Sequence, residues 1–160
     1  MKLILFRHGI AQERGSKEND DLRELTSKGS DKVKIAGKGL KKLINKNEKI
    51  SIWTSPLVRA TQTATILHNS IKKSDISVVD SISNNDFESF KKQVLSQLED
   101  MTLIVVGHSP YLNEWCLKIT GVNLELKKGG AVCIEIAEKD KLQGKILWFI
   151  QPKTWSLIKW

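Results

Sequence analysis

The chain has 160 residues, of which 40% are hydrophobic and 28% charged, and its formal net charge is +8. This composition is typical of a globular protein, so we expect a single domain over residues 1–160. No apolar run approaches the roughly 20 residues that cross a bilayer, and the N-terminus shows no signal-peptide pattern. Cys116 and Cys133 lack metal-ligand spacing, so we expect two buried thiols in a cytoplasmic protein.

The lysines that produce the positive charge are scattered along the chain rather than gathered in one motif. They occur, for example, in residues 38–49, 70–75 and 126–130. No DNA-binding motif and no aromatic platform for single strands accompanies them. The sequence therefore favours a solvated lysine surface over a nucleic-acid interface, with a field that attracts acidic or phosphorylated ligands.

In the first half of the chain, short apolar runs alternate with helical periods. Residues 2–6 (KLILF) predict the first strand and residues 50–53 (ISIW) the second. Between them, apolar residues three and four apart predict an amphipathic helix: Val33, Ala36, Leu40, Leu43 and Ile44. After the second strand, a further helix has one apolar face: Ala60, Ala64, Leu67 and Ile71.

The second half continues this pattern and then changes character. Residues 76–80 (ISVVD) predict a short third strand, and residues 101–107 (MTLIVVG) predict a fourth that is buried on both faces. The helix between them is marked by Phe87, Phe90, Val94 and Leu98, and the helix after them by Leu112, Trp115, Cys116 and Ile119. Residues 131–137 (AVCIEIA) and 145–151 (KILWFIQ) predict a closing antiparallel pair.

Strands that alternate with helices predict an α/β fold. We expect a three-layer sandwich whose mainly parallel central sheet has helices on both faces and an antiparallel C-terminal edge. In such sheets ligands bind beyond the carboxyl ends of the strands. The residues that directly follow each strand are therefore the candidates for function.

Three of these strand ends carry cationic or imidazole side chains. Arg7, His8 and Gly9 follow the first strand, Arg59 follows the second, and His108 follows the fourth. Arginine forks match phosphoryl oxygens in charge and geometry. The set contains no carboxylate or cysteine cluster, so we expect no metal. The sequence therefore predicts a phosphate site at this edge of the sheet.

Two Ser-Pro pairs and a glycine add to this prediction. Ser55-Pro56 and Ser109-Pro110 have the pattern of a helix N-cap followed by the first helical residue. Both helices are then expected to begin at the same edge, with the positive ends of their dipoles at the site. Gly9 is expected to leave room for the main chain to approach an anion closely.

The same segments resemble a known family. Residues 5–11 (LFRHGIA) resemble the RHG signature of the histidine phosphatase superfamily, which has the phosphoglycerate mutase-like fold, and residues 55–64 and 105–110 resemble its second and third blocks. Residues 22–29 (LRELTSKG) and 126–136 (LKKGGAVCIEI) resemble elements of the short SixA-type phosphohistidine phosphatases. The resemblance covers nearly the whole chain.

The resemblance implies a metal-independent phosphatase without a cofactor. His8 would be the nucleophile that forms a phosphohistidine on the enzyme. Arg7, Arg59 and His108 would hold the phosphoryl oxygens, and the cationic neighbours would oppose protonation of His8. Main-chain N–H groups near Gly9 and Ser109 are expected to add contacts with the substrate.

The residue Arg23 has two interpretations, because it either reaches the substrate or braces the loop of the site. The general acid of the reaction is also open. The segment after the third strand offers Asp80 and Asp86, and Asp80 is our candidate for the proton donor, although a solvated aspartate explains it equally well. A weak or missing acid suits a phosphoramidate substrate, because a protonated imidazole leaves more easily than an alkoxide.

The intervals between the motif blocks are nearly filled by core elements, so no cap over the site is expected. An open site suits a phosphorylated side chain on another protein, and we expect a phosphohistidine phosphatase similar to SixA. The alternative is a small-molecule phosphomonoesterase of the same superfamily. A non-catalytic phosphate-binding module, a nucleic-acid-binding module and a mutase fit the sequence less well, and a membrane partner is not expected.

Overall fold

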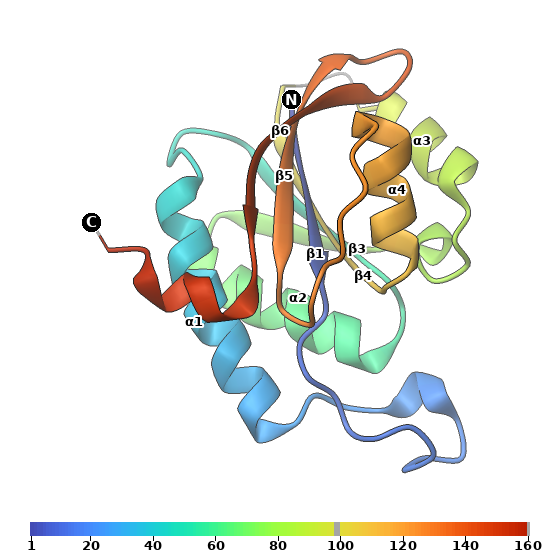
Figure 1. Ribbon diagram of the computed structural model, residues 1–160, viewed down its shortest axis with the longest axis vertical. Helices are drawn as coiled ribbons and strands as arrows, with labels where there is room; N and C mark the ends of the chain where they lie inside the picture. Colours follow the sequence, from blue (N-terminus) through green and yellow to red (C-terminus); the bar gives the residue numbers. More distant parts are fainter. Residues whose placement is uncertain (98–99, 160) are drawn as a thin grey trace.

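In a computed structural model, which describes residues 1–97 and 100–159, the chain forms a six-stranded sheet of order β3-β2-β4-β1-β5-β6 (Figure 1). The neighbours among β3, β2, β4 and β1 are parallel. β5 runs antiparallel to β1, and β6 runs antiparallel to β5. The strands are β1 (Lys2–Arg7), β2 (Ile50–Thr54), β3 (Ser74–Val78), β4 (Thr102–Gly107), β5 (Ala131–Glu138) and β6 (Gln143–Ile150).

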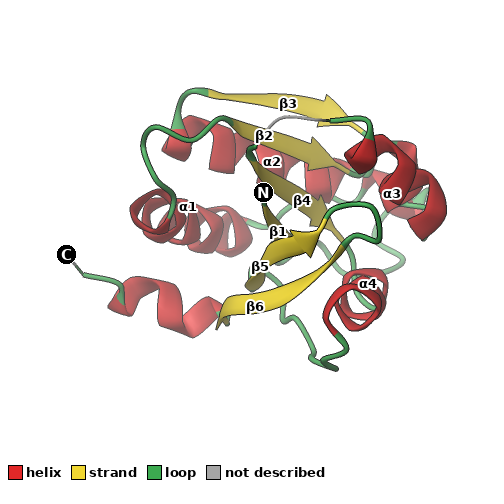
Figure 2. Cartoon of the chain, turned by 90° about the horizontal axis from the view of Figure 1, so that it is seen from above, coloured by secondary structure: helices red, strands yellow, loops and turns green. Residues whose placement is uncertain are grey.

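Helices cover both faces of this sheet, as Figure 2 shows. One face carries α1 (Ser27–Leu43) and α2 (Val58–Ile71), and the other carries α3 (Phe87–Leu95) and α4 (Tyr111–Thr120). Short 3-10 turns complete the described chain: η1 (Asp20–Leu22), η2 (Asp80–Ile82) and η3 (Pro152–Leu157). The predicted three-layer α/β sandwich with an antiparallel C-terminal edge is confirmed. None of the helices in the described ranges is long and apolar enough to cross a membrane.

The two faces have separate cores, because alternate strand residues point to opposite sides of the sheet. In β1, Ile4 and Phe6 pack with α1 and α2, whereas Leu3 and Leu5 pack with α3 and α4. Every residue of β4 is buried, as expected for a strand covered on both sides. β1 and β4 therefore form a rigid centre, and their carboxyl ends hold the predicted site.

The helix starts differ in detail from the prediction. α2 begins at Val58 with Leu57 as its N-cap, and α4 begins at Tyr111 with Pro110 as its N-cap. The prediction that Ser55 and Ser109 cap these helices is therefore wrong. Their hydroxyl groups hydrogen-bond elsewhere, Ser55 to a histidine and Ser109 to Leu126. Both helices nevertheless begin at the carboxyl edge of the sheet.

The end of the third strand and the end of the following helix also need comment. β3 occupies Ser74–Val78, so Asp80 opens the turn η2 instead of ending the strand. Phe87, Phe90 and Val94 form the buried face of α3 as predicted. Leu98, the last residue assigned to that face, lies outside the described residues.

The first turn of α1 supports the loop that leaves β1. Thr26 caps α1 by accepting a hydrogen bond from the N–H of Gly29 at 2.9 Å. The N–H of Thr26 in turn donates to the carbonyl oxygen of Ile10, also at 2.9 Å. A side chain at Gly29 would overlap that same carbonyl group. Gly29 therefore allows α1 to lie directly against the backbone that follows β1.

We predict that Gly29→Ala destabilises the fold by about 1–3 kcal/mol, because the added methyl group meets backbone atoms that cannot move freely. An ordinary helical Gly→Ala change would instead stabilise the helix by about 1 kcal/mol. Urea denaturation of both proteins measures the difference. Lys28→Ala, at an exposed position of the same turn, is the control and should change stability little. A stabilised Gly29→Ala variant would contradict the packing described here.

Candidate active site

The carboxyl ends of β1 and β4 bring two histidines together. His8 follows β1 and His108 follows β4, and their ring centroids lie 5.1 Å apart. Arg7 ends β1, and Arg59 lies in the first turn of α2. His8, Arg59 and His108 are all buried. Arg7 and Arg59 lie close enough for their positive charges to act on both histidines.

The ring of His8 is held in one tautomer. Its Nδ1 lies 2.7 Å from the carbonyl oxygen of Gly9, and a carbonyl oxygen only accepts, so Nδ1 carries the proton. Burial lowers the pKa of His8 to about 3, and the charges of His108, Arg59 and Arg7 act in the same direction. His8 is therefore neutral near pH 7, and its Nε2 carries a lone pair.

His108 is also neutral and is oriented by Ser55. Its Nε2 lies 2.7 Å from the hydroxyl oxygen of Ser55, which accepts a hydrogen bond from the N–H of Leu57 at 3.3 Å. Burial, together with Arg59 and Arg7, lowers the pKa of His108 to about 4. When Ser55 donates to Nε2, the proton of His108 resides on Nδ1, which is buried and has no protein partner in the described chain.

The two arginines keep unpartnered donors in this buried space. Arg7 donates from Nη1 to the carbonyl oxygen of Leu126 at 2.7 Å, but its Nε is buried without a hydrogen-bond partner in the described residues. The Nε of Arg59 is in the same state. Burial lowers the pKa of both guanidinium groups, yet arginine stays charged in proteins. Buried, charged and unsatisfied donors are costly, and an anion is the ligand that would satisfy them.

Asp20, which the sequence analysis missed, is a carboxylate in direct contact with Arg59. It accepts hydrogen bonds from Nε of Arg23 at 2.7 Å and from Nη2 of Arg59 at 3.3 Å. Its main-chain oxygen accepts from Nη1 of Arg59 at 3.1 Å. The hydrogen bond with Arg23 lowers the pKa of Asp20. The one sequence signal was its place three residues before Arg23, where η1 brings the two side chains together.

Arg23 braces the loop of the site. Besides Asp20, its Nη1 donates to the carbonyl oxygen of Gln12 at 2.7 Å. These bonds tie the segment after His8 to η1. Of the two interpretations that the sequence left open, the geometry favours the supporting role.

Gly9 has a different role from the one predicted. Its N–H donates to the hydroxyl oxygen of Thr63 at 3.1 Å, so it is not free for a substrate. A Cβ at this position would lie 2.6 Å from Cγ2 of Val33. The geometry gives no support to the predicted contact between Gly9 and an anion; instead this glycine lets the loop pack against α1 and α2.

A surface hollow with a volume of about 380 Å³ lies beside Arg59, Asp20 and His108. It is lined by Arg14, Asp20, Asp21, Leu57, Arg59, Ser83, Asn84, His108, Ser109, Pro110 and Tyr111. Ser109 thus lies at the site as predicted, although its hydroxyl group is 3.3 Å from both Asn113 Oδ1 and the carbonyl oxygen of Leu126. Arg59 and His108 line the hollow, and the neutral ring of His8 lies behind it, 5.1 Å from that of His108 between ring centroids; this combination of buried cations and neutral imidazoles suits a phosphoryl group.

Asp80 does not line this hollow. It is exposed and lies in η2, where its carbonyl oxygen accepts a hydrogen bond from the N–H of Ser83. Asp86 caps α3 by accepting from the N–H of Ser89 at 3.0 Å. The geometry therefore gives no support to Asp80 as the proton donor. In the described ranges, no group of three or more histidine, cysteine or acidic residues is placed to hold a metal ion.

Known proteins resemble this chain in both sequence and fold. An uncharacterized protein of Picosynechococcus sp. (strain PCC 7002) is 37% identical over 139 residues, which cover 82% of this chain and 83% of that protein. The structure of the protein histidine phosphatase SixA complexed with tungstate matches with a TM-score of 0.81 at 18% identity and covers 96% of this chain and 99% of that one. A mycobacterial glucosyl-3-phosphoglycerate phosphatase matches with a TM-score of 0.72 at 14% identity, over 94% and 99% of the two chains.

The structural matches show that the sheet and its helices have the phosphoglycerate mutase-like α/β fold that the sequence predicted. The sequence profile of the histidine phosphatase superfamily (branch 1) matches residues 3–103. That segment contains His8 and the two arginines whose charges act on it, Arg7 and Arg59. The chain belongs to the histidine phosphatase superfamily.

Proposed function

We propose that this protein is a metal-independent phosphatase that works through a covalent phosphohistidine on His8, and that its substrate is a phosphohistidine on another protein. Membership of the superfamily supports phosphatase activity in general. The choice of phosphohistidine as substrate rests on Asp20 and Asp80, neither of which is suited to donate a proton to the leaving group. Asp20 is paired with Arg23 and Arg59, and Asp80 does not line the hollow.

In the first step of this mechanism, Nε2 of His8 attacks phosphorus and the bond from phosphorus to the leaving group breaks. The electron pair of that bond goes to the leaving group, which also takes up a proton. Water then attacks the phosphohistidine, the P–N bond breaks, and inorganic phosphate and neutral His8 are released. Arg7, Arg59 and His108 offset the charge on the phosphoryl oxygens in both steps.

The leaving group links this mechanism to the substrate. The hydrogen bond with Arg23 keeps the pKa of Asp20 below its usual value, so this carboxylate is ionised at neutral pH and is a poor proton donor. An alkoxide leaving group needs a strong acid, whereas the imidazole of a phosphohistidine takes a proton from solvent on its second ring nitrogen. The hollow is also open at the surface, and a similar fold is found in the protein histidine phosphatase SixA.

The second candidate is a small-molecule phosphomonoesterase. The similar fold of the glucosyl-3-phosphoglycerate phosphatase favours this alternative, because the same scaffold there belongs to an enzyme named for a sugar-derived phosphate. Substrate preference separates the two candidates.

The test is a comparison of kcat/KM on a histidine-phosphorylated protein, a phosphoserine peptide and small phosphate esters. We predict the highest value on the phosphorylated protein, and no turnover of any substrate by His8→Ala. Wild-type enzyme quenched during turnover should carry an acid-labile, base-stable phosphate on His8. A higher kcat/KM on a small ester would favour the phosphomonoesterase, and activity of His8→Ala within tenfold of wild type, about 1.4 kcal/mol, would refute the nucleophile.

The two aspartates should respond differently to substitution. Asp80→Asn should leave all rates within about twofold, because the side chain is exposed outside the hollow. Asp20→Asn should lower kcat/KM by about tenfold, near 1.4 kcal/mol, since Arg59 and Arg23 lose the carboxylate that positions them. Rates on phosphohistidine, aryl phosphates and alkyl phosphates should fall by similar factors. A loss confined to alkyl phosphates would instead identify Asp20 as a general acid.

The low pKa values of His8 and His108 predict two pH effects. Because His8 stays neutral far below its usual pKa of 6.5, kcat should show no inflection near pH 6.5 and should persist to about pH 5. The unfolded chain, whose histidines titrate near 6.5, binds more protons than the folded chain between about pH 4 and 6.5. Stability therefore falls as the pH drops through that window.

Urea denaturation at several pH values measures the second effect. In a His8→Asn/His108→Asn variant the decrease between pH 6.5 and 4.5 should be smaller than in the wild type. Carboxylates such as Asp20 are present in both proteins, so the difference isolates the histidines. An equal decrease in both proteins would contradict the buried neutral state.

A further inference from the structure

A second hollow lies at the opposite edge of the sheet from the active site. Residues at the ends of α1 and α2 and at the start of β2 line it, and its volume is about 320 Å³. Ile44, Ile50 and Ile71 contribute apolar walls, and each is buried. The rim carries four exposed lysines: Lys41, Lys46, Lys72 and Lys73. We call this feature the lysine-rimmed pocket.

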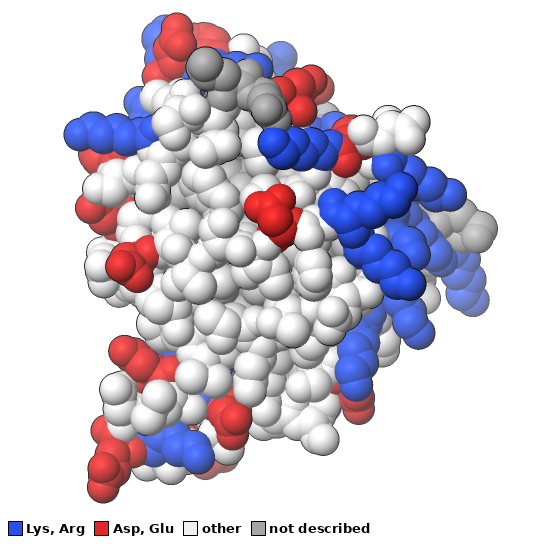
Figure 3. Space-filling view, turned by 180° about the vertical axis from the view of Figure 1, so that it is seen from behind, with Lys and Arg blue, Asp and Glu red and all other residues white. Residues whose placement is uncertain are grey.

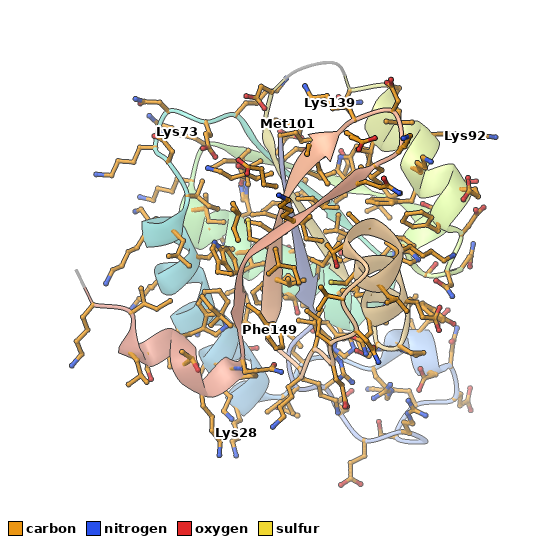
Figure 4. The ribbon with its side chains drawn as sticks, turned by 45° about the horizontal axis from the view of Figure 1, so that its top comes forward. Lys28, Lys73, Lys92, Met101, Lys139 and Phe149 are labelled. Atoms are coloured by element: carbon orange, nitrogen blue, oxygen red, sulfur yellow. The ribbon has the colours of Figure 1, made fainter. Side chains whose placement is uncertain are left out.

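The rim has a positive charge that the described protein does not neutralise. None of the four lysines forms a salt bridge with a carboxylate in residues 1–97 and 100–159. Glu48, which also lines the pocket, is already paired with Lys2 at 2.6 Å and accepts from the hydroxyl of Thr102. Figure 3 shows lysine and arginine side chains gathered on one flank of the molecule, and in Figure 4 Lys73 extends away from the ribbon.

The backbone at Lys72 and Lys73 is strained. Lys72 has φ 55° and Lys73 has φ 58°, the left-handed region that favours glycine. The lysines in the last turn of α1, Lys41 and Lys42, interact favourably with the dipole of that helix. The helix dipole does not explain why Lys72 and Lys73, which follow α2, have positive φ angles. Strain of this kind concentrates where side chains serve a function. Lys72 and Lys73 both line the apolar hollow.

We propose that the lysine-rimmed pocket is a docking site for an acidic protein segment that carries one large apolar side chain between carboxylates. The isoleucine walls would bury the apolar anchor, the kind of contact that supplies most binding energy. The lysine rim would pair with the flanking carboxylates and steer their approach. This goes beyond the proposed function, because a partner docked here leaves the catalytic hollow at the other edge free.

The apolar walls of the pocket favour an acidic protein segment with an apolar side chain over other anionic partners. A nucleic-acid backbone or a vesicle surface would pair with the lysines, yet neither places an isolated apolar group between negative charges. The pocket is also concave, which suits a single inserted side chain. An acidic segment with an anchor uses both the charge and the apolar walls.

The test uses a fluorescein-labelled, glutamate-rich peptide with one central phenylalanine, and the same peptide with alanine in its place. Anisotropy titrations at physiological salt should show at least tenfold tighter binding of the phenylalanine peptide, about 1.4 kcal/mol. Labelled single-stranded DNA and phosphatidylglycerol vesicles are titrated in parallel. Equal affinity for the two peptides, or tighter binding of DNA or vesicles than of the phenylalanine peptide, would overturn the proposal.

A matched pair of variants separates docking from folding. Lys72→Gly/Lys73→Gly relieves the backbone strain, so it should keep or raise the midpoint of thermal unfolding while weakening binding of the phenylalanine peptide at least tenfold. Lys28→Ala/Lys92→Ala removes the same charge at exposed sites away from the pocket and should bind like the wild type. Phosphatase activity on a small ester should persist in both variants. Unchanged binding by Lys72→Gly/Lys73→Gly would refute the docking site.

Discussion

The burial of positive charge at the carboxyl edge of the sheet is the constraint on which the site depends. Burial at this edge disfavours the protonated forms of His8 and His108, and the charges of Arg7 and Arg59 act in the same direction. Both imidazoles therefore remain neutral, so His8 keeps the lone pair on which its proposed role as nucleophile depends. The same positive charge favours an anion as ligand, because an anion both offsets the charge and accepts from the guanidinium donors that have no partner in residues 1–97 and 100–159. The neutral imidazoles and the affinity proposed for phosphate thus both depend on cations and histidines buried at the same edge.

Such a cluster needs external support, because like charges repel. The support comes from hydrogen bonds between distant segments. Gly9 is held by Thr63 of α2, Ile10 by Thr26 at the start of α1, and Gln12 by Arg23. Asp20 adds a negative charge and accepts hydrogen bonds from two guanidinium groups at once. The central strands β1 and β4 are buried on both faces, so these restraints act on a rigid base.

The sequence predicted the features that depend on local pattern. Apolar runs and helical periods located the strands and helices, and because parallel strands end at one edge, Arg7, His8, Arg59 and His108 could be assigned to one site. The sequence did not predict side chains that hydrogen-bond to residues far along the chain. Ser55 looked like a helix cap but bonds to His108, which is 53 residues away. Asp20 contacts Arg59, 39 residues away, so Asp80 was preferred on the basis of its place after a strand.

The net charge of +8 combines two positive regions that differ in physical character. At the carboxyl edge of the parallel strands the charge belongs to buried arginines, where the low dielectric strengthens each electrostatic contact. At the opposite edge it belongs to exposed lysines, whose field is screened by salt within about 10 Å. Such charges speed the approach of a ligand more than they strengthen its binding. A ligand held at the lysine edge therefore needs an apolar contact as well as charge, whereas a phosphoryl group held at the arginine edge needs only its oxygens.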